Sequence, residues 1–338
     1  MKKRLFGKFD TGADVYEYTI ENENASLSVM TRGATITDFT VFGTSIIGGF
    51  ETYEEYLRDD SHQGAVIGRV ANRIRGARFV MDGVEYNITK NDGDNTLHGG
   101  VGFDFRLWTV TETTDTSITL SYVSEDGEEG FPSRLTAHVT YTLSGTDLII
   151  DYKAIPDGKT PIALTNHSYF NLDGMGDTVC DHVATIWAST YTEVDSTLIP
   201  TGNHPSVSGT AFDFRTPHKI GERIGGDFIG YDHNFVLSPE HFESFGGKSL
   251  GLIAEVSGKA LSMKTYTDQP GVQFYIGNFL HTGENQPSFK GGIKRILHGA
   301  FCLETQTEPD CINHGIGFYG KGEVYTHSTV YRIEREKA

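Results

Sequence analysis

Cysteine, basic residues and long apolar runs are all scarce in this chain of 338 residues. The three cysteines are an odd number and lie far apart, which does not fit a disulfide framework. No apolar stretch approaches the length needed to span a membrane, and no apolar segment follows the basic start at residues 1–8. We therefore expect a protein of the reducing cytoplasm that does not bind a membrane.

Basic residues are outnumbered by acidic ones. Lys and Arg total 28 against 45 Asp and Glu, for a formal net charge of −17. A strongly acidic chain is repelled by phosphate backbones and by anionic lipid surfaces. We expect no nucleic-acid partner.

Helix-forming stretches are also rare, and only residues 53–57 look helical. Instead the chain is rich in glycine (40), tyrosine (16) and phenylalanine (21), and apolar residues alternate with polar ones. Residues 135–154 read as two strands joined by a hairpin turn, and Asp82-Gly83 predicts a tight turn between strands at 79–81 and 84–88. Without a linker or repeat, the pattern predicts one all-β domain over residues 1–338, a large antiparallel β-sandwich.

Glycine-rich polar stretches at 195–233 and 281–299 are predicted loops, which in a sandwich tend to build sites.

Two familiar motifs fail their structural tests. Residues 315–320 match Gly-x-Gly-x-x-Gly, but a strand pattern follows rather than a helix. Residues 247–251 match Gly-x-Ser-x-Gly, but polar sequence precedes them, and we expect a loop there. No metal-ligand spacing is present, so we predict neither a metal nor a cofactor.

Two titratable residues stand among apolar and aromatic neighbours. Glu304 lies on an expected strand, with Cys302, Glu304 and Gln306 on one face. Desolvation there would raise the basicity of Glu304 toward that of a general base. An equally good interpretation is that Glu304 is a partly exposed carboxylate on a strand. His167 ends an apolar strand within Asn-His-Ser-Tyr-Phe-Asn. An isolated histidine is more often structural, but this density of amides, hydroxyls and rings suits a sugar site.

Further polar groups suited to gripping hydroxyls stand at several positions. Two of them have an alternative interpretation: Arg73 could equally be a structural ion-pair partner, and Asp232 a turn residue at a strand start. His98 precedes Gly99-Gly100, which lets the backbone approach a ligand closely. We predict that the sugar-binding candidates are Asn72, Arg73, His98, Tyr169, Asp232 and, as the weakest, Gln273.

The chain resembles the aldose 1-epimerase family, also called galactose mutarotases, over its whole length. The resemblance is carried by five segments in the family's order: 68–74, 97–100, 165–172, 232–234 and 303–306. It implies a galactose mutarotase-like supersandwich with an open cleft. It also implies that Glu304 is the catalytic base and His167 the catalytic acid, with His98 assisting near the ring oxygen. Asn72, Arg73, Asp232 and Gln273 would bind the sugar.

The implied reaction interconverts the α and β anomers of a free hexose such as D-galactose or D-glucose. Glu304 would take the anomeric proton while His167 protonates the ring oxygen, and a bell-shaped pH profile follows. The alternatives are a non-catalytic carbohydrate-binding module, a glycoside hydrolase using Asp232 and Glu304, and an epimerase for a phosphorylated or unusual sugar. We expect a monosaccharide partner and a monomer or weak homodimer.

Overall fold

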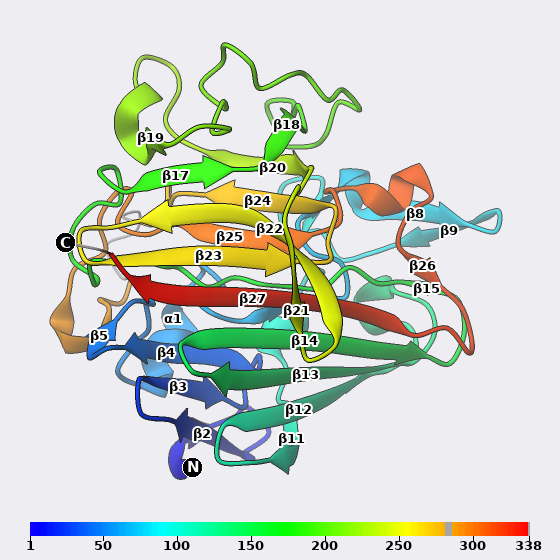
Figure 1. Cartoon of the computed structure of the whole chain (residues 1–338). Helices are drawn as coiled ribbons and strands as arrows, with labels where there is room; N and C mark the ends of the chain where they lie inside the picture. Colours follow the sequence, from blue (N-terminus) through cyan, green and yellow to red (C-terminus); the bar gives the residue numbers. More distant parts are fainter. Residues whose placement is uncertain (281–285, 337–338) are drawn as a thin grey trace.

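The computed structural model describes residues 1–280 and 286–336. The described chain is built from antiparallel strands that form three large sheets and several two-stranded ladders (Figure 1). The all-β architecture predicted from the sequence is therefore confirmed. Within the described ranges, no helix is long and apolar enough to cross a membrane.

The largest sheet has ten strands. Its order is β11 (Thr109–Thr113), β12 (Ser117–Ser124), β13 (Leu135–Ser144), β14 (Asp147–Pro156), β27 (Tyr325–Arg335), β23 (Leu261–Thr267), β22 (Lys248–Ser257), β17 (Val183–Ile186) and β19 (His218–Lys219), with β21 (Phe242–Phe245) paired to β22. Strands β13 and β14 form the predicted hairpin, with Leu143 opposite Leu148. The alternate residues Leu148, Ile150 and Tyr152 are buried, so one face of this sheet covers the core.

Two smaller sheets pack against that buried face. One contains β1 (Lys2–Lys8), β2 (Asp14–Glu21), β3 (Ala25–Met30), β4 (Thr35–Val41) and β5 (Thr44–Ser45); the other contains β18 (Ala188–Tyr191), β20 (Asp232–Leu237), β24 (Gly271–Tyr275) and β25 (Cys302–Gln306). The Tyr141 hydroxyl of β13 donates to the carbonyl of Ala34 at 2.6 Å, next to β4. The Tyr331 hydroxyl of β27 donates to the carbonyl of Leu303 in β25 at 2.7 Å. The layers thus form a sandwich.

Short ladders and turns complete the described chain. The ladders are β6 (Val66–Ile67) with β16 (Thr165–Asn166), β7 (Arg73–Ile74) with β10 (Thr96–Leu97), β8 (Arg78–Met81) with β9 (Val84–Asn87), and β15 (Thr160–Pro161) with β26 (Phe318–Tyr319). The 3-10 helices are η1 (Arg75–Ala77), η2 (Phe103–Phe105), η3 (Glu128–Gly130), η4 (Ile220–Arg223), η5 (Lys290–Gly292) and η6 (Cys311–His314). The predicted helix is α1 (Tyr53–Arg58), which begins after the capping residue Thr52.

The turn predictions have mixed outcomes. Asp82 and Gly83 both have positive φ and join β8 to β9, which confirms the Asp-Gly hairpin. The loop predicted at 247–251 is wrong, because Lys248 begins strand β22. Gly246 and Gly247, with φ of 57° and 86°, form a two-residue turn between β21 and β22. Strand β27 follows the Gly-x-Gly-x-x-Gly segment, so the argument against a dinucleotide-binding helix is confirmed.

Candidate active site

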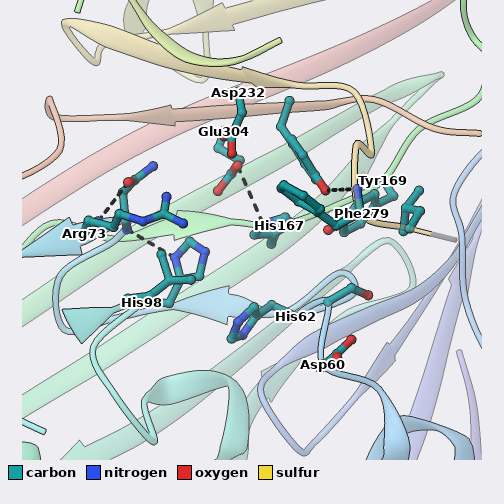
Figure 2. Close-up of a pocket in the computed structure, with 14 residues that line it drawn as sticks. Asp60, His62, Arg73, His98, His167, Tyr169, Asp232, Phe279 and Glu304 are labelled. Carbon is teal, nitrogen blue, oxygen red and sulfur yellow. Dashed lines mark hydrogen bonds and ion pairs between the residues drawn. The ribbon is translucent and has the colours of Figure 1, made fainter. Parts of the chain in front are cut away.

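A cavity of about 220 Å³ joins residues from all five of the sequence segments singled out above. Its volume lies below the range of drug-sized pockets, about 300–1,000 Å³, and suits a small ligand. Its lining consists of Asp60, Ser61, His62, Asn72, Arg73, Leu97, His98, His167, Tyr169, Asp232, Tyr275, Phe279, Leu280 and Glu304 (Figure 2). Seven of the eight predicted site residues are therefore brought together; Gln273 is the exception. From the predicted loop at 195–233, only Asp232 reaches the cavity, and residues 281–285 of the other loop lie outside the described residues.

Strand β25 places Glu304 in the cavity. The strand pairs with β24, where Gln273 lies opposite Glu304. Thr305, on the other face, contacts Thr329 of the ten-stranded sheet, so alternation turns Glu304 away from that sheet. Glu304 is only 2% exposed, and its Oε2 has no hydrogen-bond partner among the described residues.

His167 lies directly beside this carboxylate. It follows β16, where the Thr165 hydroxyl donates to the backbone carbonyl of Thr305 at 2.8 Å and ties the two site segments together. The Nε2 atom of His167 is 3.7 Å from Oε1 of Glu304, as the dashed line in Figure 2 shows. The Tyr169 ring stacks on the His167 ring, with centroids 5.0 Å apart. The imidazole is thus held between an aromatic face and the carboxylate.

His98 is presented by the β7–β10 ladder and has a positive φ of 55°. Its Nδ1 accepts a hydrogen bond from the backbone N–H of Asn72 at 3.2 Å. An accepting Nδ1 carries no proton, so the neutral ring bears its proton on Nε2. His98 therefore offers a hydrogen-bond donor at Nε2.

Two of the predicted binding residues, Arg73 and Asp232, are each held in place by a side-chain hydrogen bond. The Arg73 Nε donates to Oδ2 of Asp92 at 2.8 Å, which fixes the guanidinium at the cavity wall. The Gln273 amide donates to Oδ1 of Asp232 at 2.7 Å from outside the cavity lining. Asp232 thus faces the cavity, whereas Gln273 orients it from behind.

Burial controls the protonation of the paired groups. Desolvation, and then the charge of the nearby His62, lowers the pKa of His167 to about 3. Desolvation, and then the charge of Asp232, raises the pKa of Glu304 well above its ordinary value. Both shifts favour the neutral form. Between the two pKa values, the Glu304–His167 pair therefore shares a single proton.

Comparison with known proteins agrees with this geometry. The sequence model of the aldose 1-epimerase family matches residues 16–332. This chain belongs to the aldose 1-epimerase family. It is 41% identical to the galactose mutarotases of Bos taurus and Homo sapiens, over 98% of each chain. The crystal structure of galactose 1-epimerase from Lactobacillus acidophilus has a TM-score of 0.86 and 26% identity, and the match covers 99% of each chain.

Several cavity residues of this family member were not predicted from the sequence. His62 precedes β6, and its ring lies 4.7 Å from the His98 ring between centroids. Phe279 is 54% exposed at the cavity, and Tyr275 accepts a hydrogen bond from the backbone N–H of Phe279 at 3.1 Å. The only sequence signal for His62 was its place shortly before the Gly68–Ile74 segment, which did not distinguish it from a loop histidine.

One group of side chains can also hold a metal ion. The ligand atoms of His98, His167 and Glu304 lie within 4.8 Å of one another. Two imidazoles and one carboxylate suit a divalent cation such as zinc, and they equally suit proton transfer without one. The absence of a metal requirement in this family member stays a prediction.

The hydrogen bond between Thr165 and Thr305 offers a test of how the pair is held. Thr165→Val keeps the side-chain volume but removes the hydroxyl, so we expect unfolding to become easier by about 1–3 kcal/mol. We also expect a further fall in activity in protein that remains folded, because His167 and Glu304 lose their common anchor. Thr165→Ser keeps the hydroxyl and should retain most activity. Thermal denaturation and initial rates measure both effects, and equal activities of folded Val and Ser variants would contradict this role.

Proposed function

We propose that Glu304 and His167 carry out the proton transfers of this enzyme, an isomerase of the aldose 1-epimerase type. The substrate is a free aldose such as D-galactose, whose α and β anomers the enzyme interconverts. The observation that carries the proposal is the buried contact of 3.7 Å between the two side chains in a cavity lined by polar groups.

Glu304 supplies one half of the chemistry. Its Oε2 is buried without a partner among the described residues, and such an oxygen gains most from a hydroxyl donor on a bound ligand. A sugar placed with its anomeric hydroxyl there meets both members of the pair. In a non-catalytic binding module, nothing would require a buried carboxylate to touch a buried imidazole, so the contact favours an enzyme.

The reaction moves two protons and breaks one bond. The base takes the proton of the anomeric hydroxyl, the C1–O1 bond gains carbonyl character, and the bond from C1 to the ring oxygen breaks as the acid protonates that oxygen. Rotation about C1–C2 presents the other face of the aldehyde. Reclosure returns both protons, so the enzyme ends in its starting state and no cofactor is consumed.

Burial refines the assignment of acid and base. The pair shares one proton and therefore has two states, which differ only in the position of that proton. In the first state Glu304 and His167 are both neutral. In the second Glu304 is ionised and His167 is protonated. Burial favours the first in the free cavity, and Glu304 acts as the base only from the second, in which its proton has moved to His167. The acid and alkaline limbs of the pH profile therefore report the protonation of the pair as a whole, rather than of Glu304 and His167 separately.

The other lining residues bind the rest of the sugar. Asp232 accepts from hydroxyls, Arg73 and Asn72 donate to them, and His98 Nε2–H donates near the reacting centre. Phe279 and Tyr169 offer ring faces to apolar C–H surfaces. Gln273 acts indirectly through Asp232. These contacts hold the distal hydroxyls and leave C1 free to change configuration.

The charges in the cavity favour a neutral sugar over a phosphorylated one. Arg73 is the one lysine or arginine in the described lining, and it is already paired with Asp92. Three carboxyl groups, those of Asp60, Asp232 and Glu304, face the same space. A phosphate dianion would meet repulsion here without a bidentate partner to offset it.

The protein's setting is a further part of the proposal. All three cysteines are free thiols, which supports a reducing compartment such as the cytoplasm. The packing of two sheets on one ten-stranded sheet supports a single domain over residues 1–338. The partner is a small sugar, with no nucleic acid or membrane, and a monomer or weak homodimer is sufficient because the cavity is lined by one chain.

Polarimetry on freshly dissolved α-D-galactose tests the function. Wild-type protein should accelerate the change in rotation, and Glu304→Gln should lower kcat by about 10²- to 10⁴-fold, because it removes one proton carrier. Glu255→Gln is the matched control. Glu255 is a half-buried residue of β22 that lies outside the cavity lining, so this variant should keep wild-type activity. Folded wild-type protein that binds galactose without acceleration would indicate a binding module. Release of sugar from methyl galactoside would instead indicate a hydrolase.

The pH dependence of kcat/KM provides a second prediction. Activity should fall on the acid side only as the pair gains a second proton, near the His167 pKa of about 3 rather than near the ordinary value of about 6.5. It should fall on the alkaline side as the pair loses its one shared proton. Initial rates corrected for the uncatalysed reaction, with folding checked at each pH, measure both limbs. An acid limb centred near 6.5 would contradict a desolvated pair.

A further inference from the structure

A third histidine, His62, lies in the wall of the cavity. Its ring centroid is 4.7 Å from that of His98 and 6.0 Å from that of His167. In Figure 2, Glu304 lies on one side of His167 and His62 lies on the other. A sugar with C1 at the Glu304–His167 pair would therefore meet His62 through a different oxygen.

A buried carboxylate holds this imidazole in place. The Nδ1 of His62 is 2.7 Å from Oδ2 of Asp104, and the two side chains are only 15% and 4% exposed. Within the described residues, His62 is the one hydrogen-bond partner of the Asp104 carboxylate, because Oδ1 has none. Asp104 is carried by η2, which packs against β6, the strand that begins four residues after His62. The carboxylate is thus dedicated to this one ring.

The orientation leaves one ring nitrogen for a ligand. Since Nδ1 is engaged by Asp104, Nε2 is the atom that remains, and no hydrogen bond to it exists in the described part of the chain. A histidine with a purely structural role is usually satisfied at both nitrogens when it is buried. Here one nitrogen is fixed by protein and the other is left beside the sugar cavity.

The charges around His62 distinguish it from His98 and His167, whose pKa values are lowered. Burial lowers the pKa of His62, but the hydrogen bond to Asp104 and the charges of Asp59 and Asp60 outweigh it, so that the pKa is raised. The other titratable or charged groups around the ring are His98 and His167 in the cavity and Arg32 behind it. The hydrogen bond from His62 Nδ1–H to the Asp104 carboxylate is charge-assisted, and such bonds are about twice as strong as neutral ones, so this contact orients the ring firmly.

We propose that His62 is a further substrate-binding residue, whose Nε2 forms a hydrogen bond with one sugar hydroxyl remote from C1, accepting when the ring is neutral and donating when it is protonated, and that Asp104 is its positioning residue. The inference rests on the proposed function, since it takes the cavity to hold an aldose. It assigns to this pair a role in affinity and in discrimination between sugars, whereas Glu304 and His167 carry the chemistry. Loss of His62 should therefore act mainly on KM.

The test compares His62→Ala, His62→Gln and Asp104→Asn with wild type, using galactose and its 2-, 3-, 4- and 6-deoxy derivatives. With galactose, His62→Ala should lower kcat/KM by about tenfold to a hundredfold, mainly through a higher KM. His62→Gln keeps a neutral side chain that can both donate and accept a hydrogen bond and should recover part of this loss, and Asp104→Asn should give a smaller loss in the same direction. The His62→Ala loss should disappear for the one deoxy sugar that lacks the contacted hydroxyl.

His218→Ala provides the matched control, because His218 also pairs with a carboxylate, that of Glu222, but lies outside the cavity lining. It should keep wild-type kinetics. A His62→Ala loss of equal size with every sugar, or a lower Tm with unchanged KM, would overturn the proposal and leave His62 a structural residue.

Failure of the proposed function is distinguishable from failure of this inference. Wild-type protein that does not accelerate anomer exchange would contradict the function alone. In that case titration calorimetry with the same sugars still decides the role of His62. Affinity that is lower in His62→Ala for every sugar but one would support the contact, and equal affinities would overturn it.

Discussion

The contact between a buried carboxylate and a buried imidazole is the constraint on which the rest of this structure depends. Glu304 and His167 are each less than a tenth exposed and lie 3.7 Å apart. Removing both from water is costly, and the cost falls when they share one proton rather than carry opposite charges. The same desolvation shifts both pKa values in the way that the proposed proton transfer to and from a sugar requires. The fold must therefore hold two polar groups together where separate burial would be unfavourable.

The sandwich meets this constraint through the layer behind β25. The Thr305 hydroxyl contacts His327 Nε2 at 2.9 Å, and the Tyr331 hydroxyl donates to the carbonyl of Leu303, so that β25 is bonded to β27 on the face away from the cavity. Strand β25 thus fixes Glu304, whereas Arg73 and the residue before His98 lie on a short two-stranded ladder. The rigid sheet therefore holds the carboxylate of the pair in place.

The sequence predicted what depends on local pattern. Period-two alternation placed Glu304 on the face opposite Leu303 and Thr305, and the Asp-Gly turn was correctly placed at 82–83. What it could not supply was register between distant strands. Gln273 lies opposite Glu304 but bonds to Asp232 on β20, which no spacing along the chain reveals. His62 was missed for the same reason, because its orientation depends on a contact with Asp104, which is 42 residues away in the sequence.

The central claim is that Glu304 and His167 act as one proton-sharing unit. A double-mutant cycle on kcat for galactose anomer exchange tests it most directly, using Glu304→Gln, His167→Gln and the double variant, each shown to be folded. We expect the double variant to lose little more activity than the more damaged single variant, because either change disables the same unit. Losses that multiply would contradict it, since they would mean that the two residues contribute independently.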